Sequence, residues 1–314
     1  MAVAGVDLGG TKIQTVVVVN GEVAGTDRTS TPPKGPDDVL DAIAATVRSA
    51  LEQSGQSELT AVGIGTPGEI DESAGAVSLA KNVPGFADRV ELGPQIAKRL
   101  GGVEVRVDND VSVATLGEVR RGAGRPFKDL LGVFVGTGVG GGVVLGGELR
   151  TGRGAAGEIG HTVVKHEGRT CTCGRRGCLE AYAGRASMEA RARKLVDKGR
   201  TTVLFEVMKD KGRDRLTSGV FAAALDHGDE MAAELIEDAV WALGVGLASA
   251  QNLLDMEAII LGGGLGDRLG EPFLERVRSS MKPHLFVSDR APTLLGTELR
   301  DLSGAVGAAV LAGG

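Results

Sequence analysis

The feature that most constrains the fold of this chain is a sequence unit that occurs twice. Gly5–Lys12 is an apolar run that ends in a glycine-rich turn, and a second apolar run follows it up to Asn20-Gly21. Gly132–Gly138 has the same character and is followed by an apolar run up to Gly146-Gly147. Each copy is typical of a strand, a glycine turn, a second strand and a tight hairpin turn. Because the copies are more than a hundred residues apart, they predict two similar lobes.

The rest of the chain alternates helix and strand patterns. Apolar residues at helical spacing predict an amphipathic helix over Asp37–Leu51, with Asp37 as its N-cap, and a long helix over Met231–Leu254. Ser303 is predicted to cap a last helix that runs to Leu311. Short apolar or alternating runs predict strands at 61–65, 103–107 and 258–261. Strands alternating with helices indicate the α/β class with mixed sheets.

Composition excludes several classes of function. The 314 residues carry a net charge of −6 without a strongly basic run, which argues against a nucleic-acid partner. The most apolar stretch, 239–254, contains Gln251 and Asn252 and is typical of a buried helix rather than a membrane span. The first residues lack the pattern of a secretion signal, and three cysteines do not make a disulfide framework. We therefore expect a cytoplasmic protein without membrane association.

The two glycine turns are candidate phosphate-binding loops. Their backbone N–H groups are unobstructed, and each turn adds a threonine hydroxyl. Asp7, at the end of the first strand, is a candidate Mg²⁺ ligand, directly or through water. The alternative is that the glycines only build hairpins, but the repetition with threonine in both turns favours phosphate binding. The predicted contacts are Asp7, Gly9, Gly10, Thr11, Lys12, Gly136, Thr137 and Gly138.

An Asn-Asp pair follows the predicted strand at 103–107. In phosphoryl transfer a carboxylate accepts the proton of the attacking hydroxyl, and Asn109-Asp110 suits that role, with Asn109 holding a neighbouring hydroxyl. The pair is equally typical of a turn or a helix cap, which the spacing by itself favours. Asp108 is as good a carboxylate as Asp110 on composition.

The three cysteines indicate a metal site. Cys171, Cys173 and Cys178 lie within eight positions of a chain that has no other cysteine. Zinc prefers four nitrogen or sulfur ligands, so a histidine is needed, and His161 and His166 are the nearest. Four protein ligands would make the zinc structural. Free thiols or a regulatory disulfide are the alternatives.

Acidic residues and a histidine flank this cluster. Glu158 and His161 precede it and Glu180 follows it. Carboxylates and imidazole hold sugar hydroxyls by charge-assisted hydrogen bonds. A His161 that gives one ring nitrogen to zinc keeps the other for a hydroxyl. Surface acids beside a loop are the alternative.

With these motifs assembled, the sequence resembles the ROK family of bacterial sugar kinases and sugar-responsive repressors, and within it the glucokinases. The resemblance covers nearly the whole chain. Residues 7–12 match the first phosphate loop of the family and residues 136–140 the second. The segment 158–161, followed by the three cysteines and Glu180, matches its signature of sugar and zinc ligands.

The resemblance implies a two-lobed actin/hexokinase-like (ribonuclease H-like) α/β fold with a cleft between the lobes. It divides the chain into a small domain, 1–108 plus the C-terminal helix 301–314, and a large domain, 109–300, with the zinc-binding loop. It implies transfer of the γ-phosphoryl group of ATP, with Mg²⁺, to the 6-hydroxyl of glucose. A homodimer or homotetramer is implied as well.

The resemblance also assigns roles to residues. Asp110 becomes the general base, and Gly262, Gly263 and Gly264 form the glycine turn near the adenosine. The implied sugar ligands are Gly68, Asn109, Asp110, Glu158, His161 and Glu180. The implied ligands of the structural Zn²⁺ are His161, Cys171, Cys173 and Cys178.

Two other functions stay open within this resemblance. One is a kinase for another hexose, namely fructose, mannose or N-acetylmannosamine, and polyphosphate is a possible second phosphoryl donor. The other is a sugar-sensing transcriptional regulator. A regulator carries a helix-turn-helix domain ahead of the kinase-like body, and a phosphate loop that begins at Asp7 leaves no room for one.

Overall fold

The computed structural model describes all residues from 1 to 314, which form two compact units. Unit 1 consists of Met1–Lys128, Gly142–Ala156 and Glu298–Gly314, and unit 2 of Asp129–Gly141 and Gly157–Thr297. Unit 1 continues beyond residue 108, where the sequence analysis divides the chain, and it includes the last residues of the protein.

Unit 1 is built on a five-stranded sheet with the order β3-β2-β1-β4-β7. These strands are β1 (Ala2–Leu8), β2 (Lys12–Val19), β3 (Glu22–Ser30), β4 (Ala61–Thr66) and β7 (Glu104–Asn109). Strand β2 is antiparallel to β1 and β3, whereas β4 is parallel to β1 and β7. The parallel strands β1, β4 and β7 end at the same edge, which brings the chain after Asp7 and the chain after Asp108 to one side of the sheet.

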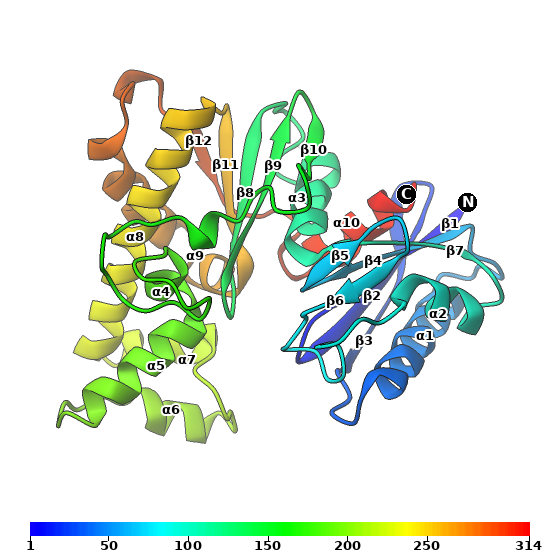
Figure 1. Ribbon diagram of the computed structural model, residues 1–314, viewed down its shortest axis with the longest axis horizontal. Helices are drawn as coiled ribbons and strands as arrows, with labels where there is room; N and C mark the ends of the chain where they lie inside the picture. The colour runs from blue at the N-terminus through cyan, green and yellow to red at the C-terminus, as the bar shows by residue number, and fades with distance from the viewer. The chain divides into compact units, whose positions relative to one another are not determined.

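The second sheet repeats this topology with the order β10-β9-β8-β11-β12 (Figure 1). Its strands are β8 (Leu130–Val135), β9 (Val139–Leu145), β10 (Glu148–Arg150), β11 (Ala258–Gly262) and β12 (Thr293–Leu295). Strand β10 is antiparallel to β9, and β11 is parallel to β8 and β12. In both sheets the first strand of the repeat is central, with its hairpin on one side and parallel strands on the other. The repeat predicted from the sequence is confirmed, as is the α/β actin/hexokinase-like class.

Both hairpin turns have the backbone that their residues favour. Asn20 and Gly21 have φ angles of 52° and 87°, and Gly146 and Gly147 have φ angles of 64° and 81°. Two consecutive positive φ angles are the mark of a type I′ turn, for which Asn-Gly and Gly-Gly are preferred. The predicted hairpin turns are confirmed.

Helices cover both faces of the sheet of unit 1 (Figure 1). Helix α1 (Pro36–Gln53) and helix α2 (Leu92–Arg99) pack on one face, where α1 buries Val39, Ile43 and Val47. Asp37 is not the N-cap of α1, so that prediction is wrong: Gly35 is the N-cap, and Pro36 begins the helix. Proline suits the first position because it lacks an N–H that would have no partner there.

The other face is covered by α10 (Ser303–Leu311), which packs on β1, β4 and α3 (Asp110–Arg121). This contact is close because both sides are made of small residues. A Cβ atom at Gly5 would overlap the carbonyl oxygen of Ala305, and one at Gly63 would overlap that of Ala308. The backbone of α10 therefore lies directly on that of two strands, and only glycine fits there.

A buried carboxylate joins α3 to the start of α10. Glu118 is fully buried, and its oxygens accept hydrogen bonds from the backbone N–H groups of Ala123, Glu298 and Leu299 at 3.0 to 3.1 Å. The Ser303 hydroxyl donates a fourth bond at 2.7 Å. The prediction that Ser303 caps α10 is wrong. Ser303 is the first residue of the helix, and its hydroxyl bonds Glu118 instead of capping the helix.

The helices of unit 2 surround the loop that carries the cysteines. The long helix α8 (Glu230–Leu254) is confirmed, and the Asp229 side chain caps it by accepting from the N–H of Ala232 at 2.7 Å. The remaining α-helices are α4 (Glu180–Ala183), α5 (Arg185–Val196), α6 (Leu204–Asp210), α7 (Ser218–Asp226) and α9 (Gly263–Met281). None of the helices combines the length and apolarity that crossing a bilayer requires.

Candidate active site and metal centre

The first predicted phosphate loop is a tight turn between β1 and β2. The N–H of Gly9 donates to the carbonyl of Lys12 at 2.9 Å, and the Thr31 hydroxyl donates to the carbonyl of Gly9 at 2.6 Å. A Cβ atom at Gly10 would overlap the carbonyl oxygen of Asn82. The loop is thus held by hydrogen bonds to the first residue of β2 and from the residue that follows β3, and Gly10 allows the backbone of Asn82 to pack closely against it.

Asp7 lies beside this loop with its carboxylate largely desolvated. Burial raises the pKa of Asp7, and the Lys12 ammonium, with Nζ at 3.7 Å, opposes that shift. The carboxyl carbon also packs against the first turn of α10, since a Cβ at Gly304 would lie 2.9 Å from it. Mg²⁺ prefers oxygen ligands, and a partly buried carboxylate beside a phosphate-binding turn provides one. Asp7 therefore fits the role predicted for it.

The Asn-Asp pair stands where β7 ends and α3 begins. Asn109 is the N-cap of α3, and its Oδ1 accepts from the N–H groups of Val111 and Ser112 at 3.0 and 3.2 Å. The helix-cap interpretation of Asn109 is confirmed, and it leaves the side-chain Nδ2 as the donor for a ligand. Asp110 is the first residue of the helix, where a carboxylate interacts favourably with the helix dipole.

Asp108 has a different environment from Asp110. It is only 7% exposed at the end of β7, and burial raises its pKa to about 6, partly opposed by the bond that its Oδ1 accepts from the N–H of Asn109 at 2.6 Å. A carboxyl group that titrates close to neutral pH is well matched to proton transfer. The geometry thus leaves Asp108 as a second candidate base beside Asp110.

The second predicted phosphate loop lies at the end of β8 in unit 2. The N–H of Gly136 donates to the carbonyl of Gly138 at 2.9 Å. The start of α5 is hydrogen-bonded to the loop. The N–H groups of Arg185 and Ala186 donate to the carbonyls of Gly136 and Thr137 at 3.2 and 3.0 Å. Like the first loop, it is a short turn of glycine and threonine between two antiparallel strands, although its closing hydrogen bond spans two residues rather than three.

Arg185 is a candidate phosphate ligand that the sequence analysis missed. Its guanidinium donates to the Ser218 hydroxyl at 2.7 Å and to the Thr137 hydroxyl at 3.5 Å, and burial lowers its pKa. Both of these partners are uncharged, so the buried cation beside the loop is not neutralised by them. The only signal in the sequence is its position five residues after Glu180, which carries no chemistry by itself.

The predicted glycine turn near the adenosine lies against the same loop. Gly262 ends β11 and Gly263 begins α9. Gly263 has a φ angle of 79°, and a Cβ at Gly264 would lie 2.9 Å from both Arg185 Nη1 and Ser218 Oγ. Unit 2 therefore brings together the second phosphate loop, Arg185 and the N-terminus of α9, a set of donors suited to anions.

The four predicted zinc ligands gather in one cluster. The donor atoms of His161, Cys171, Cys173 and Cys178 all lie within 4.8 Å of one another, and His166 is not part of the group. The sulfur atoms of Cys173 and Cys178 are 3.8 Å apart, as are Cys171 Sγ and His161 Nδ1. Tetrahedral zinc with Zn–S bonds of about 2.3 Å places sulfur ligands about 3.8 Å apart, so the residues fit this metal.

The thiols of this cluster differ in acidity. Burial raises the pKa of Cys171 to about 12, whereas a hydrogen bond from Arg175 lowers the pKa of Cys173 to about 6. Metal binding requires thiolates and therefore releases protons from the less acidic thiols. The affinity of such a site for a metal therefore decreases as the pH is lowered.

The predicted sugar ligands of unit 2 contact one another through the cluster of His161 and the three cysteines. His161 presents Nδ1 to Cys171, while its Nε2 lies 3.9 Å from Glu158 Oε2. Glu180 Oε1 accepts from the Thr172 hydroxyl at 2.8 Å and from Cys171 Sγ at 3.6 Å. A metal bound at Nδ1 would fix the His161 ring with Nε2 directed toward a carboxylate, which is an arrangement that suits vicinal hydroxyls.

The other predicted sugar ligands belong to unit 1. Asn109 and Asp110 stand at the start of α3. Gly68 follows β4 with a φ angle of 112°, and a Cβ there would lie 2.5 Å from the carbonyl oxygen of Ser78. Each unit therefore contains one predicted phosphate loop and part of the predicted sugar-binding set.

Comparison with known proteins gives a consistent assignment. The sequence model of the ROK family matches residues 3–314. The chain is 36% identical over 315 residues to a glucokinase of Streptomyces coelicolor, which covers 98% of this chain and 96% of that protein. It is 35% identical over 285 residues to a glucokinase of Thermotoga maritima, covering 89% and 88%. A ROK family glucokinase of Streptomyces griseus, solved in complex with glucose and AMPPNP, superposes with a TM-score of 0.83 at 34% identity, covering 99% of each chain.

Proposed function

The chain belongs to the ROK family, and from this membership and its site we propose that it is a glucokinase, which transfers the γ-phosphoryl group of ATP to the 6-hydroxyl of glucose. The observation that carries the proposal is the bonding of Glu180. One of its oxygens bonds the second phosphate loop at Val139, and the other bonds the metal-binding loop at Thr172. A single carboxylate thereby ties the phosphate-binding element to the sugar-binding element.

In this proposal Asp110 is the general base. Phosphoryl transfer needs little covalent participation by the protein beyond positioning the groups, and a carboxylate takes the proton of the attacking hydroxyl. Asp110 at the first position of α3 is held by the helix itself, with Oδ1 3.0 Å from the N–H of Val111. Asn109, whose Oδ1 caps the same helix, would donate from Nδ2 to a neighbouring hydroxyl.

The sugar would be held by Gly68, Asn109, Glu158, His161 and Glu180, and by Asp110 at the hydroxyl that reacts. Structural Zn²⁺ would be bound by His161 Nδ1 and the three cysteine thiolates and would supply no chemistry beyond fixing the loop. His161 then keeps Nε2 for a hydroxyl, and Glu158 and Glu180 accept from hydroxyls by charge-assisted hydrogen bonds.

The nucleotide would be held by both glycine loops, with Lys12 and Arg185 as cations and Gly262, Gly263 and Gly264 near the adenosine. When bound, Mg²⁺ would neutralise charge on the phosphate oxygens, and Asp7 would be its protein ligand. Arg185 suits this role because its guanidinium lies beside Thr137, with hydroxyl partners on its two terminal nitrogens Nη1 and Nη2.

A coupled assay of ADP release across a hexose panel tests the proposal. With ATP as donor we expect the highest kcat/KM for glucose and lower values for mannose, fructose and N-acetylmannosamine. The same panel with polyphosphate in place of ATP, read out as the hexose 6-phosphate formed because this donor releases no ADP, decides whether the polymer also serves as donor. ADP release that is stimulated by no hexose would contradict a kinase function and favour the sugar-sensing regulator. A preference for another hexose would retain the kinase and correct its substrate.

Location and assembly belong to the same proposal. We propose a cytoplasmic enzyme that forms a homodimer or homotetramer. Sedimentation velocity at several protein concentrations measures the assembly directly, and a monomer at all concentrations would contradict this part.

A further inference from the structure

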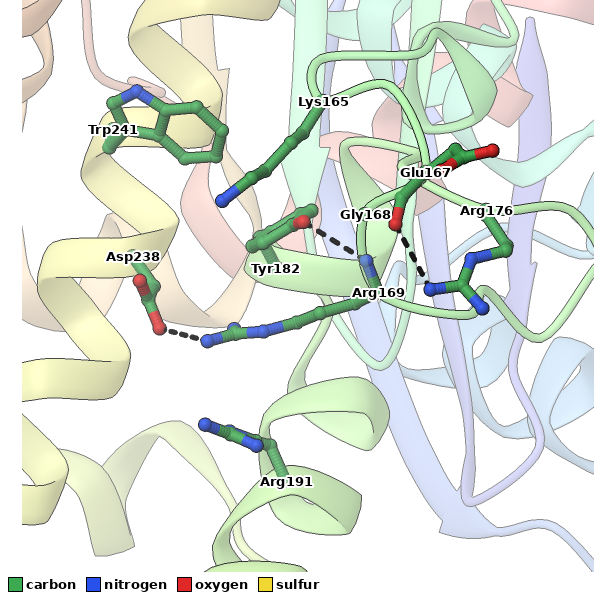
Figure 2. Close-up of a pocket in the computed structure, with 9 residues that line it drawn as sticks. All are labelled: Lys165, Glu167, Gly168, Arg169, Arg176, Tyr182, Arg191, Asp238 and Trp241. Atoms are coloured by element: carbon green, nitrogen blue, oxygen red, sulfur yellow. Dashed lines mark hydrogen bonds and ion pairs between the residues drawn. The ribbon is translucent and has the colours of Figure 1, made fainter.

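Unit 2 contains a cavity of about 530 Å³ that none of the proposed glucokinase roles uses. Its walls come from the metal-binding loop at 165–176, from Tyr182 of α4, from Arg191 of α5, and from Asp238 and Trp241 of α8 (Figure 2). A volume of this size is in the range of sites for small metabolites, which is about 300 to 1,000 Å³.

The cavity is strongly cationic in a chain that is acidic overall. Lys165, Arg169, Arg176 and Arg191 line it, against only two acids, Glu167 and Asp238. The lining therefore carries an excess of two positive charges, although the whole chain has a net charge of −6. A concave surface with walls of one sign raises the local concentration of counter-ions, here anions.

Two donors in this cavity lack acceptors. Arg169 Nη1 and Arg191 Nε are both buried, and neither has a hydrogen-bond partner. Asp238 accepts from Nη2 of Arg169 and leaves Nη1 without a partner. Figure 2 shows the guanidinium of Arg191 rising from α5 on the same side of the cavity as that of Arg169. Buried donors without partners are costly, and two of them from different elements in the wall of one cavity point to an acceptor with several oxygens.

Aromatic rings form the wall beside these cations. Tyr182 and Trp241 meet edge to face, with centroids 5.4 Å apart, and Lys165 Nζ lies 6.0 Å from the Trp241 centroid. The Arg169 guanidinium lies over the Tyr182 ring at 4.7 Å, which holds it in place. The cavity thus offers an apolar ring surface next to an anion-binding corner.

We propose that this cavity binds a phosphoryl dianion, with its oxygens accepting from Arg169 Nη1 and Arg191 Nε. A dianion matches the excess of two positive charges, and guanidinium groups recognise phosphoryl oxygens by charge-assisted hydrogen bonds. The dianion is either free inorganic phosphate or the phosphoryl group of a phosphorylated sugar whose ring lies against Trp241. The two sources share one chemistry and are distinguished below.

The site is connected to the proposed sugar ligands through the backbone. Arg169 and Arg176 flank Cys171 and Cys173, and the N–H of Gly177 donates to the carbonyl of Arg169 at 2.8 Å. Tyr182, two residues after Glu180, accepts with its hydroxyl from the N–H of Arg169 at 3.0 Å. An anion that holds Arg169 would therefore order the loop that positions Glu180. This effect on turnover rests on the proposed function, whereas the binding itself does not.

The test uses the fluorescence of Trp241, which is the only tryptophan of the chain and lines the cavity. Inorganic phosphate and glucose 6-phosphate are titrated separately into the full-length, zinc-loaded protein at constant ionic strength. Saturating glucose and a non-hydrolysable ATP analogue are present, so that neither titrant competes for the proposed active site. We expect a saturable change in emission for at least one titrant. Tighter binding of glucose 6-phosphate identifies a sugar phosphate as the ligand, and equal or tighter binding of inorganic phosphate identifies the free ion.

Arg191→Gln should weaken this binding by about tenfold or more, because it removes a charged donor. Lys194→Gln removes the same charge from the same helix outside the cavity and should leave the binding constant unchanged. Arg169→Lys keeps the positive charge that faces Asp238 but loses the additional N–H donors of the guanidinium, so it should also weaken binding. Circular dichroism verifies that each variant is folded.

The proposal is overturned if neither titrant changes the emission, or if Arg191→Gln binds as tightly as the wild type. It is also overturned if Arg191→Gln dissociates an oligomer in sedimentation while phosphate has no effect, because the arginines would then pair with carboxylates of a second copy. ADP release by the wild-type protein is measured in parallel. Its presence without phosphate binding refutes this site alone and leaves the kinase intact.

Discussion

Glu180 Oε2 accepts a hydrogen bond from the backbone N–H of Val139 at 3.0 Å. Val139 follows the second phosphate loop directly, and a Cβ atom at Gly138 would overlap the same carboxylate oxygen. Since Glu180 also bonds Thr172, a sugar hydroxyl that binds Glu180 acts on a group already fixed from two sides. Such a ligand is positioned before the substrate arrives, which is the arrangement that catalysis requires.

Glu180→Gln should raise the KM for glucose by about 10- to 100-fold, because the charged acceptor becomes neutral and the oxygen that remains is needed by the Val139 N–H. Initial-rate kinetics measure this effect. Glu206→Gln makes the same change at an exposed position of α6 and should leave KM unaltered. Equal KM values for the two variants would exclude Glu180 as a sugar ligand.

Asp110→Asn should lower kcat by about 10²- to 10⁴-fold while leaving glucose affinity nearly unchanged, since only proton acceptance in the transition state is lost. Steady-state kinetics and equilibrium glucose binding together separate the two effects. The base would have to be reassigned to Asp108 if Asp108→Asn proved crippling and Asp110→Asn mild.

Asp108 makes stability depend on pH. Its pKa is about 6 in the fold, above the usual 3.8, so folding favours the protonated form. The stability that this group contributes is complete below pH 4 and is lost as the pH rises through 6. Asp108→Asn should therefore stabilise the protein above pH 6, by about 3 kcal/mol at most, with no gain at pH 4.

Urea unfolding between pH 4 and pH 8 measures this difference. Asp88→Asn, at an exposed position of the same unit, is the matched control and should give a difference that does not vary with pH. A gain in the Asp108 variant that is equal at pH 4 and pH 8 would rule out the raised pKa as its cause.

Cys173→Ser should remove the bound zinc and lower the melting temperature by several degrees, because the metal closes the loop between His161 and Cys178. Elemental analysis of the purified variant and thermal unfolding measure both effects. Chelator treatment of the wild type should reproduce the loss of stability. Wild-type protein that contains no zinc after purification without chelator would contradict the assignment.

Gly63→Ala should destabilise the protein by about 1 to 3 kcal/mol, because the new methyl group would force α10 away from β4. Chemical denaturation gives the difference in unfolding free energy. Gly219→Ala makes the same change in α7, where the nearest atom to the new methyl would be 3.9 Å away, and should be neutral or slightly stabilising. A Gly63 variant as stable as the Gly219 variant would show that α10 adjusts freely.

The sequence sufficed to predict features that depend on neighbouring residues. The two hairpins followed from Asn20-Gly21 and Gly146-Gly147, because few other pairs adopt two positive φ angles. The three cysteines indicated a metal site by their spacing, whereas the choice of His161 over His166 came from the family resemblance and agrees with the folded loop.

Features that depend on distant residues could not be predicted in this way. Ser303 has the character of a cap, yet its hydroxyl serves Glu118, which lies 185 positions earlier in the chain. Arg185 became a candidate phosphate ligand only when the fold placed it beside Thr137 and Ser218. The cationic cavity likewise joins α5 and α8 to the metal-binding loop, and no local pattern relates these segments.

The position of α10 has a consequence for biosynthesis. Residues 298–314 complete the packing of the first sheet, where α10 lies against Gly5 and Gly63. They also donate three of the four hydrogen bonds that Glu118 accepts. During translation, residues 1–109 leave the ribosome well before residues 298–314, so the face of their sheet that α10 covers is exposed until that helix emerges. The opposite face can pack against α1 and α2 earlier, so the face beneath α10 is where a chaperone would be expected to bind the nascent chain.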